Sequence, residues 1–209
     1  MRTGNLDDLI DNRTTALVET LSGDDGNDTI RLGGAPAVVV FADGGAGNDV
    51  LYSGAGSDVI DGGEGNDTVS YAGRIGAVTA DLGDPYTWMG IVFAGHGGVA
   101  GENDGFKNLE NLTGGGGADL LSGSDVANVI DGGSASSPCG TPPCSTFSGN
   151  DRLVGRGGAD TLLGRDGNDL MWGGPQFDSM DGGTGSNTCY DTAAGAAVTN
   201  CVFVVLVTP

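Results

Sequence analysis

The sequence predicts an all-β fold, a flattened parallel solenoid in which short strands alternate with tight turns. Three observations predict it. Written in blocks of nine, residues 44–70 align as GGAGNDVLY, SGAGSDVID and GGEGNDTVS without a gap. The eighth residue of each block is apolar, and the chain contains 42 glycines. A helix is excluded, because nine residues make about two and a half turns and would place successive eighth residues on opposite faces.

The nine-residue period covers most of the chain. It is present at 14–31, runs from 44 to a decayed copy at 71–79, and returns at 105–131 and 146–190. In a three-residue strand at positions seven to nine, the middle side chain points inward and its neighbours point outward. The eighth column is therefore expected to form the core, with two blocks in each coil and the coils stacked through backbone hydrogen bonds. This column consists of Leu21, Ile30, Leu51, Ile60, Val69, Val78, Leu112, Leu121, Ile130, Leu153, Leu162, Met171, Met180 and Cys189.

The first six positions of each block have the composition of a turn. Glycines at positions one, two and four permit the positive φ angles that such turns need. The sixth position is acidic in most blocks, and Gly76, Asn128 and Asn187 are the exceptions. The acidic members are Glu19, Asp28, Asp49, Asp58, Asp67, Glu110, Asp119, Asp151, Asp160, Asp169 and Asp178.

The charge balance indicates that something must offset repulsion within the fold. The chain has 28 acidic and 8 basic residues, a net charge of −20. Like charges and abundant glycine both oppose compaction, and a multivalent cation would compensate for them. A disordered acidic linker is the alternative, but regularly spaced apolar residues argue against it. We expect no nucleic-acid partner, because this surface repels phosphates, and no membrane span, because no apolar stretch is long enough.

The blocks resemble the repeats-in-toxin (RTX, hemolysin-type) calcium-binding nonapeptide repeats, a chiefly bacterial family whose pattern GGxGxDxUx is followed by GGAGNDVLY and GGEGNDTVS. The resemblance implies a right-handed parallel β-roll (β-solenoid) with several calcium ions in its turns, interrupted by loop insertions. Calcium prefers six to eight oxygen ligands, which glycine carbonyls and one carboxylate per turn would supply. The implied ligands are Asp28, Gly45, Gly47, Asp49, Asp58, Gly63, Gly65, Asp67, Asp119, Asp151, Gly158, Asp160, Gly167, Asp169 and Asp178.

The resemblance also implies which turns face each other, because an ion would lie between turns on the same edge of the roll. Each repeat then pairs with the second repeat after it. The acidic pairs are Asp49 with Asp67, Asp151 with Asp169, and Asp160 with Asp178. Weaker or empty sites are expected where one member is not acidic, namely at Asp169 with Asn187, Glu110 with Asn128, and Asp58 with Gly76. For any single aspartate, a turn-forming role without metal is the alternative.

Three interruptions divide the predicted roll, which spans residues 14–190. They lie at 32–43, 80–104 and 132–145 and are expected to be loops or strand extensions. The second contains Tyr86, Trp88, Ile91, Val92 and Phe93, which predict either an apolar flap over the roll or a contact surface. Residues 1–13, which include TGNLDDLID, are expected to form an N-terminal cap or degenerate repeat.

The four cysteines suggest two disulfides. Cys139 and Cys144 flank a Gly-Thr-Pro-Pro turn and could close a small loop. Cys189 and Cys201 could hold residues 191–209 as a capping strand over the end of the solenoid. An even cysteine count favours an oxidising compartment. Zinc binding is the alternative, although the spacings match no common zinc pattern.

No catalytic activity is predicted. His96 is the single histidine, GxSxG is missing, and the glycine-rich strings lack the lysine of a phosphate-binding loop. The expected function is calcium binding by a secreted or cell-surface module that folds on extracellular calcium and has a structural or interaction role, with its macromolecular partner unknown. The alternatives are the calcium-dependent C-terminal secretion or folding region of a larger exported toxin, protease or lipase, and a surface adhesin or ice-binding roll.

The two ends of the chain bear on export. MRTGNLDDLIDN lacks the apolar run of a signal peptide, so any export is expected to use another signal. The apolar C-terminus resembles the uncleaved export signals of this family, and a capping strand explains it equally well. The seventh column, which mixes Thr, Val, Leu, Arg and Ser, is too irregular for an ice-binding face.

Overall fold

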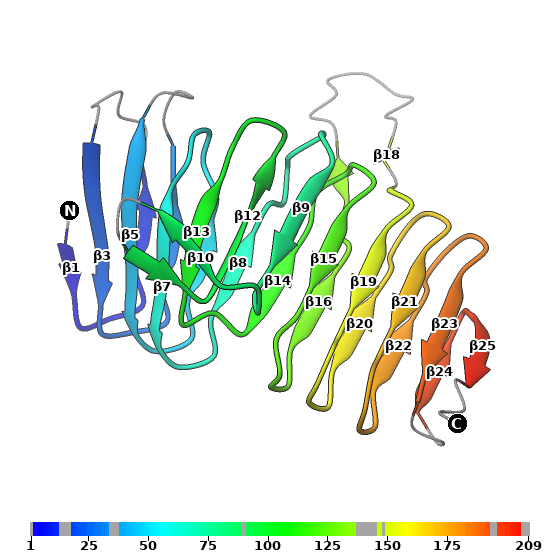
Figure 1. Ribbon diagram of the computed structural model, residues 1–209. Helices are drawn as coiled ribbons and strands as arrows, with labels where there is room; N and C mark the ends of the chain where they lie inside the picture. The colour runs from blue at the N-terminus through cyan, green and yellow to red at the C-terminus, as the bar shows by residue number, and fades with distance from the viewer. Residues whose placement is uncertain are drawn as a thin grey trace. The chain divides into compact units, whose positions relative to one another are not determined.

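Every regular element that the computed structural model describes is a β-strand (Figure 1). The description covers residues 2–12, 18–33, 38–88, 91–136, 146–147, 149–192 and 196–205. Within these ranges no helix exists that could cross a membrane. The chain divides into two compact units, Met1–Ser70 with Asp81–Asn111, and Tyr71–Ala80 with Leu112–Pro209. Each unit is a parallel β-solenoid of two facing sheets.

In the first unit, the longer sheet has the order β1-β3-β5-β7-β13-β12 and the facing sheet has the order β2-β4-β6-β8. All neighbouring strands in these two orders are parallel except β12 and β13, which are antiparallel. The longer sheet consists of β1 (Arg2–Gly4), β3 (Val18–Asp24), β5 (Val39–Ala46), β7 (Val59–Glu64), β12 (Gly95–Val99) and β13 (Asp104–Lys107). The facing sheet consists of β2 (Leu9–Asp11), β4 (Thr29–Arg31), β6 (Val50–Tyr52) and β8 (Thr68–Ser70).

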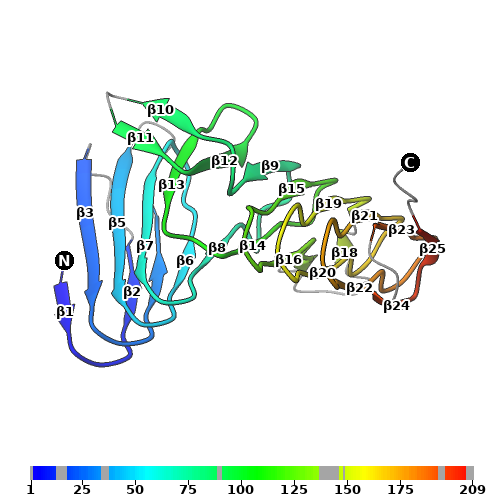
Figure 2. The same ribbon diagram turned by 60° about the horizontal axis from the view of Figure 1, so that its bottom comes forward.

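In the second unit, the two layers have the orders β9-β15-β19-β21-β23-β25 and β14-β16-β20-β22-β24 (Figure 2). The first layer consists of β9 (Val78–Asp81), β15 (Leu120–Ser122), β19 (Arg152–Val154), β21 (Leu170–Trp172), β23 (Thr188–Asp191) and β25 (Val202–Val205). The second consists of β14 (Asn111–Thr113), β16 (Val129–Asp131), β20 (Thr161–Leu163), β22 (Ser179–Asp181) and β24 (Ala197–Thr199).

The core of each unit is the column that the nine-residue period predicts. All fourteen side chains of the eighth column are at most 1% exposed, which confirms this prediction. Strand pairing keeps them in register: Leu51 lies beside Ile30 and Val69, and Met171 lies beside Leu153 and Cys189. Stacking identical positions in this way lets three-residue strands bury one apolar side chain each while their neighbours remain outside.

The residues before the first clear repeat form a further coil. Strand β1 pairs with β3, and β2 pairs with β4, which places buried Ile10 beside Ile30 in the core column. Asp8 then occupies the sixth position, because its backbone N–H donates to Asp28 Oδ1 at 2.8 Å. TGNLDDLID therefore lies in the register of a repeat.

The first and second interruptions add strands to the solenoid. The end of the first becomes part of β5, whose Val40 and Ala42 point into the core. The second forms the antiparallel hairpin β10 (Tyr86–Trp88) and β11 (Ile91–Phe93), followed by β12 and β13. Phe93 is 1% exposed and its ring lies against Gly105 of β13. The third contains β17 (Ala135–Ser136), which pairs antiparallel with β18 (Thr146–Phe147), and residues 137–145 lie outside the described residues.

Strand β13 shows that the block predicted at residues 105–113 does not begin with the first position of a repeat at residue 105. Phe106 pairs with Ile60 and is 1% exposed, so it stands in the eighth column. Asp104 consequently takes the sixth position beside Asp58, where Gly76 was expected. The reason is that the segment after β11 folds back into the sheet next to β7. The strand that it forms there contains a buried residue, which the count of nine residues had assigned to a different position of the repeat.

Candidate functional site

The predicted ligand carboxylates lie in the turns between the two sheets of each unit, and they are buried. A carboxylate that loses its hydration needs compensating partners, because burial of an unpaired charge is costly. At most 2% of each residue is exposed for Asp28, Asp49, Asp58, Asp67, Asp119, Asp151, Asp160, Asp169 and Asp178.

One carboxylate oxygen of each pair joins successive coils. Asp67 Oδ1 accepts the Asp49 N–H at 2.7 Å. The same bond joins Asp151 N–H to Asp169 Oδ1 at 2.9 Å, and Asp160 N–H to Asp178 Oδ1 at 2.8 Å. The structure therefore brings together the three acidic pairs that the sequence named, and it forms the expected Asp169–Asn187 pair by the same bond at 2.8 Å.

Other pairs bridge the interruptions. Asp49 Oδ1 accepts the Asp28 N–H at 2.7 Å, and Asp151 Oδ1 accepts the Asp119 N–H at 2.8 Å. Asp104 Oδ1 accepts the Asp58 N–H at 2.8 Å, so the expected pairing of Asp58 with Gly76 is wrong. The sequence signal for Asp104 was available, because Asp104-Gly-Phe-Lys repeats the spacing of the acidic and core residues in Asp58-Val-Ile-Asp.

Two further turns depart from the expected pattern. Glu110 Oε2 accepts the Asp67 N–H at 2.9 Å, so a glutamate continues the acidic row in the first unit. Asn128 bonds within its own turn, where Oδ1 accepts the Ser124 N–H at 2.7 Å. Asp119 has partners on both oxygens: Oδ1 accepts Val78 N–H and Oδ2 accepts Gly115 N–H, each at 2.7 Å.

The second carboxylate oxygen is the unusual feature of these turns. In six of them Oδ2 is buried and has no hydrogen-bond partner among the described residues, whereas buried polar atoms in proteins nearly always have one. The six residues are Asp28, Asp49, Asp67, Asp160, Asp169 and Asp178.

Five of these oxygens, all except that of Asp178, face a backbone carbonyl oxygen across a glycine. Asp49 Oδ2 and the Gly62 carbonyl oxygen both lie within 3.0 Å of the point where a Cβ at Gly44 would stand. Asp160 Oδ2 and the Gly173 oxygen surround Gly155 in the same way. A side chain at position one would collide with both atoms, so glycine is needed there to leave room. The result is a small space bordered by two acceptors with no donor between them.

Carbonyls from positions two and four also point between stacked turns. The Gly45 carbonyl oxygen lies against Gly63, and the Gly47 oxygen lies against Gly65, each where a Cβ would otherwise be. Gly167 receives the Gly149 oxygen in the same manner. Gly158 is the remaining glycine among the predicted calcium ligands. It has a φ of 100° and packs on the Val126 backbone, and its N–H donates to Gln176 Oε1 at 3.1 Å.

The donor set determines what these turns could bind. Among the described residues, no three His, Cys, Asp or Glu side chains converge on one point. Any cation here would take one or two carboxylate oxygens and otherwise backbone carbonyls. Such an all-oxygen set suits a hard cation that accepts irregular coordination, which is the chemistry of calcium and not of zinc.

Burial raises the pKa of these carboxyl groups. Loss of solvent is the main cause, backbone hydrogen bonds partly oppose it, and neighbouring acidic groups raise the pKa further at every position except Asp119. The pKa of Asp151 rises to about 7, and those of Asp67, Asp119, Asp160 and Asp169 rise to about 6. The same cause raises the pKa of Asp28, Asp49 and Asp178. Negative charge is therefore unfavourable in these turns when no cation is bound.

The raised pKa values make the stability of the metal-free chain depend on pH. The raised pKa values exceed the ordinary 3.8, so the folded chain binds more protons than the unfolded chain between pH 4 and 7. In metal-free buffer we expect stability to increase as the pH falls from 7 to 5. Circular dichroism of the chelator-treated chain measures it, because the small strand signal expected at pH 7 should increase toward pH 5. Asp151→Asn should flatten the profile near pH 7, and a metal-free wild type whose stability fell over this range would contradict the assignment.

Sequence reasoning missed a second row of hydrogen bonds at position five. Asn27 Oδ1 accepts the Asn48 N–H at 2.8 Å, and Asn48 Oδ1 accepts the Asn66 N–H at 2.9 Å. Asn150 and Asn168 continue this pattern in the second unit. The sequence signal was available, because Asn precedes Asp in the recurrent motif GND.

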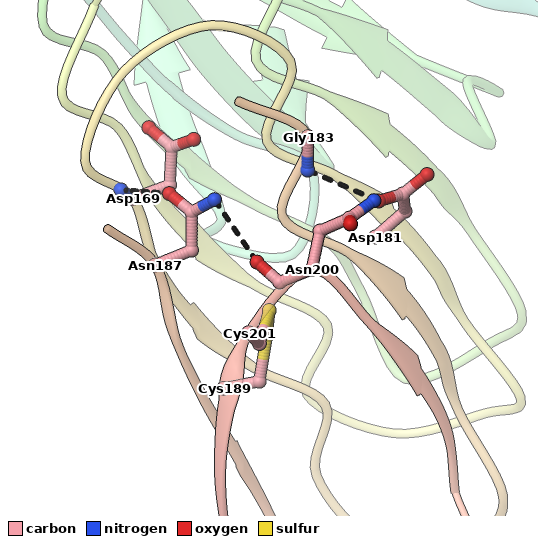
Figure 3. The surroundings of a disulfide bond; sticks show 7 residues. All are labelled: Asp169, Asp181, Gly183, Asn187, Cys189, Asn200 and Cys201. Atoms are coloured by element: carbon pink, nitrogen blue, oxygen red, sulfur yellow. Dashed lines mark hydrogen bonds between the residues drawn. A yellow bond between two sulfur atoms is a disulfide. The ribbon is translucent and has the colours of Figure 1, made fainter. Parts of the chain in front are cut away.

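The remaining residues singled out in the sequence are the four cysteines and His96. Cys189 and Cys201 form a disulfide at the last coil (Figure 3). Cys139 and Cys144 lie outside the described residues. The ring of His96 lies beside that of Tyr86, with a centroid distance of 5.5 Å, and Nδ1 is 3.5 Å from the Asp84 carbonyl oxygen.

Comparison with known families agrees with this geometry. The model of the RTX calcium-binding nonapeptide repeat matches in four copies, at residues 14–35, 41–69, 110–136 and 145–180, which together make up more than half of the chain. No curated protein matches the chain. The matched segments contain every predicted ligand turn of both units.

Proposed function

Because the chain belongs to the family of RTX calcium-binding nonapeptide repeats, we propose that it binds several calcium ions in its turns and depends on them to fold. The observation that supports this proposal is the set of six buried Oδ2 atoms, five of which face a carbonyl oxygen across a glycine. Two acceptors in one small space repel each other unless a cation, a proton or a donor lies between them. A bound cation removes this penalty at every such turn.

The residues that would hold an ion come from two successive turns on one edge. For the turn at 44–49, they are Asp49 through Oδ2, the Gly62 carbonyl, and the carbonyls of Gly45 and Gly47. These are oxygen donors of the kind that calcium prefers. Glycine at positions one, two and four brings backbone oxygens close enough to share a site, which explains the glycine content of the sequence.

We further propose that the chain works outside the cell, as a structural or interaction module without catalytic activity. The Cys189–Cys201 disulfide supports an oxidising environment. Modules with weak calcium sites, with dissociation constants of about 10⁻⁴–10⁻³ M, are suited to the millimolar calcium found there. The chain would therefore fold after export, when it first meets this concentration.

The proposal is tested by counting ions. Calorimetric titration of the full chain should show several bound calcium ions. Asp49→Asn should remove at least one of them, because an amide replaces the charged Oδ2 ligand. The matched control is Asp84→Asn, which removes the same charge from an exposed position in the first unit. A wild type without calcium binding, or equal loss in both variants, would contradict the proposal.

A further inference from the structure

The last turn on one edge of the second unit differs from those before it. The row of sixth positions on this edge runs through Asp119, Asp151 and Asp169 and ends at Asn187. After β24 only two residues, Asn200 and Cys201, connect to β25. The glycine-rich turn of six residues is thus replaced by a short connection that carries one half of the disulfide.

The Asn187 amide bonds to both neighbouring coils. Its Oδ1 accepts the Asp169 N–H at 2.8 Å, as the carboxylates do in earlier turns. Its Nδ2 donates to the Asn200 carbonyl oxygen at 3.1 Å (Figure 3). The side chain therefore satisfies one donor and one acceptor, and it does so without any added group.

The amide nitrogen stands where an unpartnered carboxylate oxygen stands in the preceding turn. At Gly164, the point of a Cβ is surrounded by Asp169 Oδ2 and the Gly182 carbonyl oxygen. At Gly182, the equivalent point is surrounded by Asn187 Nδ2 and the Asn200 oxygen. A facing pair of acceptors has become a donor and an acceptor in the same geometry.

The carbonyl that accepts this bond is fixed in place. Asn200 has a positive φ of 54°, and its Nδ2 donates to Asp181 Oδ1 at 2.7 Å. The next residue, Cys201, is joined to Cys189, which is fully buried. An asparagine at position six does not produce this arrangement by itself, because Asn128 turns its Oδ1, and not its Nδ2, toward the corresponding carbonyl of Gly155.

We propose that Asn187 and Asn200, held by the Cys189–Cys201 disulfide, form a metal-independent cap that ends the row of calcium sites on this edge. The inference rests on the proposed function, since a cap has meaning only if the preceding turns bind calcium. The side-chain Nδ2–H of Asn187 takes the role that the ion has elsewhere. The last coil then closes without a cation, and the position of Asn187 limits how many ions the edge holds.

Two substitutions at Asn187 test the cap, with bound calcium counted by titration calorimetry and native mass spectrometry. Asn187→Asp restores the facing acceptors, so it should bind one more ion than the wild type. Asn187→Ala removes the donor without adding charge, so it should bind the same number of ions and melt at a lower temperature in saturating calcium. Ala197→Asp is the control, because it adds the same charge at an exposed position of the second unit, in β24 and outside the ligand turns, and should leave the count unchanged.

The outcomes separate this inference from the function on which it rests. A wild type without bound calcium overturns the proposed function. A wild type with several ions and an Asn187→Asp protein with the same number overturns the cap alone. If Asn187→Asp does not fold, Asn187→Ala decides: an unchanged count supports the cap, and the loss of one ion would show that Asn187 is itself a ligand and overturn it.

Discussion

Removal of calcium is expected to abolish most of the β structure of this chain. Without a cation, six buried Oδ2 atoms have no hydrogen-bond partner among the described residues, and five of them face a carbonyl oxygen. Each unsatisfied group costs about 1–3 kcal/mol. A site with a dissociation constant of ~10⁻⁴ M contributes about 1.4 kcal/mol at ~1 mM calcium. Several such contributions approach the entire stability of a typical domain, which is about 5–15 kcal/mol.

Circular dichroism and calorimetry with the disulfides kept oxidised would measure this effect. The strand signal should be small in chelator and increase cooperatively with calcium, and the melting temperature should rise with calcium concentration. Magnesium at equal concentration is the control and should restore less, because it demands a small octahedral shell and retains its waters. Full strand content in chelator would show that the solenoid folds by apolar stacking alone.

The parts of the fold that sequence could predict are those that repeat locally. A period of nine with one apolar residue gives Leu51, Ile60 and Val69 the same environment, so the core column follows from spacing alone. The pairs Asp49–Asp67 and Asp160–Asp178 follow for the same reason, since uninterrupted repeats fix which turns lie on one edge.

Pairing across an interruption could not be predicted in this way. Asp28 meets Asp49 because the first interruption supplies the beginning of β5, which pairs with β3 and keeps the coils in register. Asp119 meets Asp151 across the third interruption. The strand that follows the second insertion also joins the sheet, and it brings Asp104 to Asp58 and Phe106 into the core. Counting residues through an insertion assumes that it is excluded from the sheet, and this assumption fails where the segment carries a strand of its own.

The role of a residue that departs from the repeat pattern also could not be predicted from the sequence. From sequence, Asn187 indicated a weak or empty site opposite Asp169. The structure shows that its amide nitrogen donates to the Asn200 carbonyl, a bond that depends on a two-residue turn and a disulfide. An asparagine in the same column at Asn128 bonds within its own turn instead. The residue type alone therefore does not determine the role of the position.

Substitution of a position-four glycine should be among the most damaging single changes. Gly167 has φ of 140°, and a Cβ there would meet the Gly149 carbonyl oxygen well inside 3.0 Å. Strained backbone alone costs about 1–3 kcal/mol. Because the colliding atom is backbone, the stacked turns must also separate, so we expect Gly167→Ala to lose at least about 3 kcal/mol of unfolding free energy. Calcium affinity should fall with it, since the displaced carbonyls are candidate ligands.

Two other glycines of the same unit separate the cost of backbone strain from the cost of the collision with a stacked carbonyl. Gly73 has a positive φ of 91° but nothing within 4 Å of its Cβ position, so Gly73→Ala should lose only about 1–2 kcal/mol. Gly157 has ordinary contacts and no positive φ, so Gly157→Ala should stay within about 1 kcal/mol of the wild type. Denaturant unfolding at saturating calcium measures all three variants. If Gly167→Ala were no worse than Gly73→Ala, close stacking of carbonyls on glycine would not constrain the turns, and strain alone would explain the glycine at position four.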